Sequence, residues 1–243
     1  MPQQFQPEWS HRLGSHLQRY SRMLPCVEIN STFYRVHRAT TWDRWAKETP
    51  ADFRFSIKAP KTITHDAKLR DVEPLMQAFF TQIEPLGEKR GPVLFQLPPS
   101  LAFDKSMVTD FLIAVRNMYS ADIVLEPRHP SWFNDAVDDL LVKYKITRVA
   151  ADPPKGGPKA SACGGDEGLA YYRLHGSPHM YYSSYDAAFL NSLGSKIEPH
   201  KRTWIIFDNT AAGHAYSNAL QLQVLANEIY RDEDDRSTTS LAR

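Results

Sequence analysis

The sequence has 243 residues, 42% of them hydrophobic, and its 29 basic and 28 acidic residues leave a net charge of +1. A chain of this length forms one large domain or two small ones and buries roughly 70 to 75% of its unfolded surface. The near balance of charge argues against a protein that binds nucleic acid by its net charge. A local basic rim is still compatible with this net charge.

Nothing in the sequence indicates export or membrane insertion. The first twelve residues lack the basic start and apolar run of a signal peptide, and no apolar run approaches the ~18 residues of a membrane span. The two cysteines, Cys26 and Cys163, have neither metal-ligand spacing nor the density of a disulfide scaffold. We therefore expect a cytoplasmic protein with no membrane partner.

Short segments rich in β-branched and aromatic residues alternate with helical patterns along the chain. The predicted strands are 26–30, 53–59, 92–97, 122–127, 147–152, 170–175 and 203–208. The predicted helices cover 14–24, 71–86, 104–119, 134–145 and 217–230, with Asp71 and Asp104 as N-caps. Residues 1–230 then form one domain, and the charged segment 231–243 is predicted to be a disordered tail.

Strands alternating with helices predict a parallel sheet with helices outside. Almost every predicted strand ends in a polar residue, which favours a (β/α)8 TIM-type barrel, whose strand ends ring one mouth, over an open sheet with one switch point. Only seven strands are clear, so the first strand is apparently missing. Either a segment upstream of Met1 is absent or residues 5–9 close the gap irregularly, and we favour a short start.

Strand periodicity predicts which polar side chains meet at the mouth. Residues two apart share one face of a strand, so Glu28 and Asn30 point the same way. The same holds for the pairs Ser56 and Lys58, Glu126 and Arg128, and Arg173 and His175. A purely structural alternative is that these charges form buried ion pairs that hold the mouth together without chemistry.

Two further segments contribute candidate residues. In the segment 171–178, Arg173 suits a phosphate or carboxylate and His175 exchanges protons near neutral pH. The segment 126–133 presents His129 and Trp132, although a tryptophan is more often a core residue. His65 lies in another loop, and Gln96 is more readily explained as structural.

A metal site is a weaker possibility. Carboxylates with a histidine suit Mg, Mn or Zn, but no local spacing requires one. The candidate ligands are Glu28, Glu126, Asp152, His175 and Asp208. The sequence contains no P-loop, dinucleotide-binding fingerprint, HExxH motif or nucleophile elbow.

The motifs VEINSTFYR, GPVLFQLPPSL, EPRHPSWF, YYRLHGSPHMYY and FDNTAAGHAYSNAL, in this order and spacing, resemble the domain-of-unknown-function family 72, also called YecE-like. The resemblance covers about residues 15 to 228 and implies a TIM-barrel fold but no established reaction. Members of that family usually begin with a Gly-Thr-x-Gly-Trp strand that is absent here. The motif positions fall on Glu28, Asn30, Phe33, Tyr34, Lys58, His65, Gln96, Glu126, Arg128, His129, Trp132, Arg173, His175 and Asn209.

These observations predict an enzyme with a site at the barrel mouth, acting on a phosphorylated or anionic sugar-like or nucleic-acid substrate. Lys58, Arg128 and Arg173 would neutralise the anion, and Glu28, Glu126 and His175 would be catalytic. Metal-assisted hydrolysis or isomerisation is one form of this hypothesis, by analogy of fold with sugar-isomerase and endonuclease-IV-like barrels. The alternative is a non-catalytic protein that binds an anionic ligand or a nucleic-acid end. The predicted substrate-binding residues are Asn30, Tyr34, Lys58, His65, Gln96, Arg128, His129, Trp132, Arg173 and Asn209.

Overall fold

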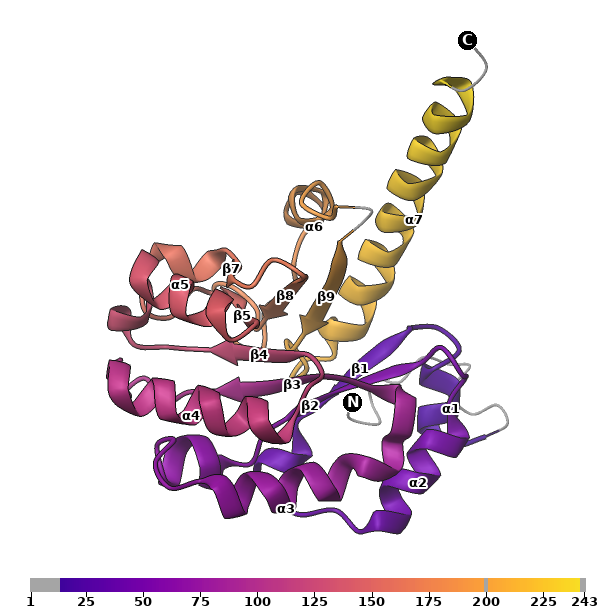
Figure 1. Cartoon of the computed structure of the whole chain (residues 1–243). Helices are drawn as coiled ribbons and strands as arrows, with labels where there is room; N and C mark the ends of the chain where they lie inside the picture. The colour runs from indigo at the N-terminus through magenta and orange to yellow at the C-terminus, as the bar shows by residue number, and fades with distance from the viewer. Residues whose placement is uncertain (1–13, 199–200, 241–243) are drawn as a thin grey trace.

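The computed structural model describes residues 14–198 and 201–240, and its strands alternate with helices along the chain (Figure 1). Each of the seven predicted strands is present within a few residues of its expected bounds. The strands are β1 (Cys26–Ile29), β2 (Arg54–Lys58), β3 (Arg90–Gln96), β4 (Ile123–Glu126), β5 (Ile146–Arg148), β6 (Ala150–Asp152), β7 (Gly164–Gly165), β8 (Leu169–Leu174) and β9 (Arg202–Phe207).

The strands form two sheets that share one interrupted strand. The larger sheet has the order β1-β2-β3-β4-β5-β7 and the smaller one the order β6-β8-β9. All pairs are parallel except β5 with the two-residue β7, which was not predicted. Val149 alone separates β5 from β6, and its amide still bonds to Leu125 of β4. The predicted strand 147–152 therefore pairs with β4 at one end and with β8 at the other.

The described strands do not close into a barrel, so the predicted TIM-type barrel with its first strand missing is confirmed only as an α/β fold with parallel strands. Within the described residues β1 pairs only with β2, and β9 pairs only with β8. A cavity of about 750 Å³ lies between these two edges, and residues from β1, β9, α1 (His16–Tyr20) and α7 (His214–Ser240) line it. The described residues thus form an α/β fold with parallel strands and no pairing between β1 and β9.

Helices cover the outer face of the larger sheet. Figure 1 shows α2 (Ala39–Glu48), α3 (Glu73–Ile83), α4 (Lys105–Met118) and α5 (Asp135–Lys143) along the side of β1 to β5. Asp104 caps α4 as predicted, because its side chain accepts a hydrogen bond from the Met107 amide. Asp71 is not the cap of α3: it adopts φ 51° outside the helix, and Val72 occupies the N-cap position.

The main core lies between this sheet and its helices. Outward-facing strand residues such as Phe55 and Ile57 are at most 1% exposed and pack with Met76, Phe79 and Ile83 of α3. Leu75, expected in the same apolar stripe, is 40% exposed because α3 turns a narrower face to the sheet. Because this core takes up the outer face of β1 to β5, the alternate residues of these strands point to the inner face.

The C-terminal part packs separately and then extends. Leu222 of α7 packs with Leu190 and Leu193 of α6 (Ala187–Gly194), beside β8 and β9. Figure 1 shows α7 running on away from the other elements. It continues through residue 240, within the segment 231–243 that the sequence predicts to be a disordered tail, and 241–243 lie outside the described residues.

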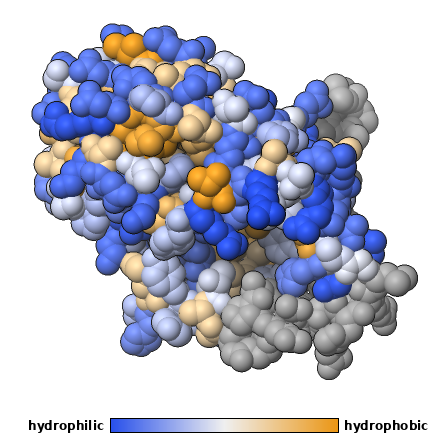
Figure 2. Space-filling model, turned by 90° about the horizontal axis from the view of Figure 1, so that it is seen from below, coloured by the Kyte–Doolittle hydropathy of each residue, from blue (hydrophilic) through white to orange (hydrophobic). Residues whose placement is uncertain are grey.

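The surface shows no wide apolar area on the face seen in Figure 2. Hydrophilic residues predominate there, and hydrophobic ones lie in small groups among them. Among the described helices none is both long and apolar enough to cross a membrane.

Candidate functional site

The inner face of the strands carries the polar residues that strand periodicity places there. Ser56 of β2 bonds to the hydroxyl of Tyr171 on β8 at 2.6 Å, and this hydroxyl donates to Glu28 Oε2 of β1 at 2.8 Å. Side chains from three strands, up to 143 residues apart, therefore meet inside the fold. Lys58 lies two residues after Ser56 on the same face, at the carboxyl end of β2.

Arg173 of β8 is the centre of this cluster and is fully buried. Its Nε and Nη2 donate to the two oxygens of Glu28 at 3.0 and 2.8 Å, which is the two-pronged geometry that suits a guanidinium. Nη1 donates to Glu126 of β4 at 2.5 Å, and Nη2 also reaches Asp208 at 3.2 Å. The guanidinium thus holds together carboxylates from β1, from β4 and from the residue that follows β9, and it leaves no exposed surface for a ligand.

Glu126 is equally engaged. Its Oε2 also accepts from Gln96 at 3.0 Å, and its Oε1 accepts from Nε and Nη2 of Arg128 at 3.0 and 2.8 Å. Burial by itself would raise the pKa of Glu126, but Arg173, His175 and Arg128 outweigh burial and hold that pKa well below its usual range. Glu126 is therefore a permanent carboxylate that positions Arg128.

His175 is held between two carboxylates. Its Nδ1 lies 3.1 Å from Asp208 and its Nε2 lies 3.4 Å from Glu126. Burial would lower the pKa of His175, but the hydrogen bonds with Asp208 and Glu126 outweigh burial and raise it. Asp208 shows the complementary effect: burial would raise its pKa, but His175 and Arg173 lower it. The pair therefore favours the protonated imidazole and the ionised carboxylate.

Lys58 differs from the other charges because its ammonium has no polar partner. Its residue is only 8% exposed, and Nζ makes no hydrogen bond or ion pair with any residue that the structure describes. Nζ lies 4.2 Å from the centroid of the Phe33 ring. Burial and the nearby Arg173 lower the pKa of Lys58 to about 8, although Glu28, Glu126 and Asp208 act in the opposite direction.

The loop after β1 holds the Phe33 ring over Lys58. The hydroxyl of Thr32 donates to the carbonyl of Lys58 at 2.6 Å and lies 3.0 Å from that of Ile29. The His65 ring contacts the same Phe33 ring edge-on, with centroids 4.9 Å apart. Burial, Lys58 and Arg128 lower the pKa of His65, so its imidazole is neutral near pH 7. Lys58 and Arg128 therefore form a cationic side of the site, with the neutral His65 close to both.

Several predicted binding residues lie elsewhere or are already occupied. Trp132 is completely buried, donates to the Leu101 carbonyl and packs on Phe103 as a core residue. Asn209 is also fully buried and bonds to Ser183 and Asn218.

The remaining predicted residues border the site. Tyr34 is 76% exposed beside Phe33, and His129 Nδ1 accepts the Ser131 amide as the cap of a short helical turn. Asn30 contributes a buried Oδ1 without a hydrogen-bond partner among the described residues. These positions surround the mouth without converging on one point.

The proposed metal ligands do not fit a metal. Within residues 14–198 and 201–240 no group of three or more His, Cys, Asp or Glu residues is arranged to hold an ion. The carboxylates of Glu28, Glu126 and Asp208 surround the Arg173 guanidinium, which takes the position between them. Asp152 accepts the Tyr185 hydroxyl at 2.7 Å. We therefore derive no chemistry through a metal at this cluster.

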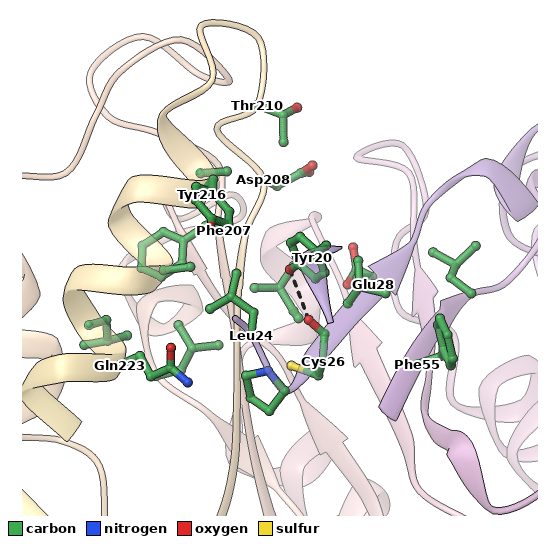
Figure 3. Close-up of a pocket in the computed structure, with 18 of the residues that line it drawn as sticks. Tyr20, Leu24, Cys26, Glu28, Phe55, Phe207, Asp208, Thr210, Tyr216 and Gln223 are labelled. Atoms are coloured by element: carbon green, nitrogen blue, oxygen red, sulfur yellow. Dashed lines mark hydrogen bonds between the residues drawn. The ribbon is translucent and has the colours of Figure 1, made fainter. Parts of the chain in front are cut away.

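The cavity between β1 and β9 reaches the same cluster from one side. Figure 3 shows the carboxylates of Glu28 and Asp208 toward one end and Leu24 and Cys26 toward the other. Tyr20 spans the cavity wall and donates to the Cys26 carbonyl at 3.1 Å.

Sequence reasoning missed Tyr171 as a member of the site. Strand periodicity contained the signal, because Tyr171 lies two residues before Arg173 on β8 and must share its face.

A parallel α/β fold with charged residues gathered at the carboxyl ends of its strands defines a class in which ligands bind at that edge. The chain matches the family described as "Protein of unknown function DUF72" over residues 3–240 and belongs to that family.

Known relatives agree with this assignment. The chain is 35% identical to the UPF0759 protein YecE of Escherichia coli K12 over 133 residues, which are 52% of this chain and 48% of YecE. The chain thus spans about half the length of YecE in this match. It is 25% identical to the UPF0759 protein YunF of Bacillus subtilis 168, covering 88% of this chain and 87% of YunF.

Two crystal structures of DUF72 proteins share the fold. The protein from Thermotoga maritima MSB8 has a TM-score of 0.71 at 28% identity, with 84% of this chain and 85% of that chain covered. The protein from Enterococcus faecalis V583 has a TM-score of 0.76 at 22% identity, with 90% of each chain covered.

Proposed function

We propose that this protein is a cytoplasmic enzyme acting on a small anionic substrate, such as a phosphorylated sugar, at the carboxyl ends of its strands. The observation that carries the proposal is the Lys58 ammonium, which has no hydrogen bond or ion pair among the described residues and lies over the Phe33 ring that His65 also contacts. Because the Lys58 ammonium makes no hydrogen bond to the described residues, its N–H donors are available to an anionic ligand. The free thiols of Cys26 and Cys163 support the cytoplasmic location.

The cationic side of the site binds the anion in this proposal. Arg128 has a side chain 15% exposed, and its Nη1 makes no hydrogen bond among the described residues while Nε and Nη2 are held by Glu126. Lys58 adds a second positive charge. Arg173 acts through Glu28, Glu126 and Asp208 as a positioning residue, because it is completely buried.

In this proposal His175 and His65 transfer the protons. His175 carries a proton between Asp208 and Glu126, which makes it an acid, and the neutral His65 is a base. Glu28 and Glu126, first considered as catalytic groups, orient the arginines instead, because N–H and O–H donors occupy their oxygens.

Calorimetric titration with glycerol 3-phosphate, inorganic phosphate and glucose 6-phosphate tests the proposal. We expect at least one phosphate ester to bind to the wild type and its affinity to fall roughly tenfold or more in Arg128→Met, which loses a charge-assisted hydrogen bond. Arg202→Met is the matched control, because Arg202 forms an exposed pair with Asp122 far from the site. Equal affinities in both variants would contradict the role of Arg128.

The alternative is a non-catalytic binding protein. The ion pairs around Arg173 favour it, because they occupy the carboxylates that would otherwise act in catalysis. It predicts the same phosphate binding but no conversion of any bound ester. Nuclear magnetic resonance of sugar phosphates incubated with the protein separates the two, since an enzyme changes the substrate spectrum and His65→Gln abolishes that change.

We also infer that the described strands belong to a TIM-type barrel whose first strand is not among them. The parallel order from β1 through the β5–β6 strand to β9, with a cavity between β9 and β1, supports this architecture. Hydrogen exchange tests it: amides of β1 and β9 are expected to exchange faster than those of β3 and β4, which have neighbours on both sides. Uniform protection of all four strands would contradict an open edge.

A further inference from the structure

We propose that Lys58 is a nucleophile that forms an imine with a substrate carrying both a carbonyl and an anionic group, such as an open-chain sugar phosphate. This inference rests on the proposed function and adds the reaction class. An amine in this role must be desolvated, aimed into the site and free of hydrogen bonds that would hold its lone pair.

The position of Lys58 meets these requirements. It ends β2 on the inner face, it is 8% exposed, and its Nζ has no hydrogen bond or ion pair among the described residues. Lys89 is the instructive contrast, because its Nζ donates to the carbonyls of Ala46 and Thr49 and to the Thr49 hydroxyl. Lys89 is therefore occupied by the protein, whereas Lys58 is available to a ligand.

The charges facing Lys58 favour a reactive amine. Arg173 lies close enough to disfavour the ammonium form, and burial acts in the same direction. Glu28, Glu126 and Asp208 oppose this effect but are themselves paired with Arg173. With a pKa of about 8, roughly a tenth of Lys58 is neutral at pH 7, which is about 300-fold more than for a lysine of pKa 10.5.

The surroundings also suit the product. The reaction is Lys58–NH3⁺ plus O=CR2 giving Lys58–NH⁺=CR2 plus water: the nitrogen lone pair forms the C–N bond and the carbonyl oxygen leaves as water. The proton that frees the amine passes to the neutral imidazole of His65, which packs on the same Phe33 ring, and returns to the departing oxygen. The iminium keeps one positive charge over the face of Phe33, where a cation is stabilised.

The anionic group of the same molecule would lie against Arg128. The charges of Lys58 and Arg128 both lower the pKa of His65, so both cations lie near this imidazole. A carbonyl compound that also carries a phosphate can therefore engage both the amine and the guanidinium, whereas a simple aldehyde engages the amine alone.

Reductive trapping tests this inference. The protein is incubated with dihydroxyacetone phosphate and sodium cyanoborohydride, and each lysine peptide is quantified by mass spectrometry. We expect a reduced adduct on Lys58 at roughly ten times the yield on the exposed Lys105 or on Lys89, and a lower yield with dihydroxyacetone. Lys58→Arg keeps the charge but forms no imine, so the site-specific adduct must vanish while glycerol 3-phosphate binding remains.

The outcomes separate the two proposals. Binding of glycerol 3-phosphate without an adduct on Lys58 would overturn the imine and leave the anion site intact. An adduct on Lys58 with unphosphorylated dihydroxyacetone, without phosphate binding, would keep the imine and reject the anionic substrate. Equal labelling of Lys58, Lys89 and Lys105 would overturn the special reactivity of Lys58.

Discussion

Arg173 of β8 and Glu28 of β1 form a two-pronged ion pair through the interior of the fold, with donor–acceptor distances of 3.0 and 2.8 Å. The two residues belong to different sheets and lie 145 positions apart in the sequence. Both side chains are essentially inaccessible to solvent. This ion pair therefore joins the two sheets and fixes the geometry of the candidate site.

Replacing Arg173 is expected to destabilise the protein strongly. Arg173→Met leaves Glu28, Glu126 and Asp208 facing one another without their common counter-ion, at a cost of about 3 to 5 kcal/mol in the free energy of unfolding. Urea denaturation measures it. Arg202→Met, at an exposed ion pair, is the control and should cost at most about 1 kcal/mol. Similar losses of unfolding free energy in both variants would show that the buried cluster stabilises the fold no more than an exposed ion pair does.

Two buried tyrosines should respond oppositely to loss of the hydroxyl. Tyr171→Phe removes the donor to Glu28 and the partner of Ser56, and we expect a loss of roughly 1.5 to 3 kcal/mol. Tyr119→Phe removes a buried hydroxyl that has no hydrogen-bond partner among the described residues, so it should be neutral or stabilising. Thermal or urea unfolding of the two variants measures the difference, and a neutral Tyr171→Phe would argue against the Glu28 contact.

His175 should titrate above the usual value for a histidine. Its raised pKa means that it contributes stability fully below about pH 6.5, and this contribution is lost as the pH rises through the pKa of the folded state. Nuclear magnetic resonance of the imidazole C–H signals measures the pKa directly. Asp208→Asn removes the nearest charged carboxylate and should lower the pKa of His175. Asp122→Asn, far from the ring, should leave that pKa unchanged. A pKa of His175 that is insensitive to Asp208→Asn would contradict the pairing.

Lys58 should react with amine reagents at a lower pH than the surface lysines. Its labelling rate is expected to rise with a midpoint near pH 8, whereas that of Lys105 should rise near the ordinary lysine value. Lys58 loses its proton at a lower pH in the folded state than in the unfolded state. The free energy of unfolding therefore rises with pH between about 8 and 10.4. Peptide mapping after brief labelling across a pH series gives both midpoints, and coincident curves would contradict the desolvation of Lys58.

Local patterns in the sequence determined the elements and their faces. The alternation of short apolar segments with helical stripes identified every described strand except the two-residue β7, because the pattern of a strand is visible within its own segment. The same period placed Glu28, Lys58, Glu126 and Arg173 on one face. The family motifs pointed to the same positions.

Only the tertiary structure decided how those residues are used. Whether the sheet closes depends on pairing between β1 and β9, which lie at opposite ends of the chain, and no local pattern reports it. Likewise, Arg173 became the buried partner of three carboxylates while Lys58 has no ion pair, because contacts between residues 35 to 145 positions apart depend on packing that local spacing does not encode. The sequence by itself predicted which charged residues share the inner face of the strands. Their packing in the tertiary structure determined which of them remains available to a ligand.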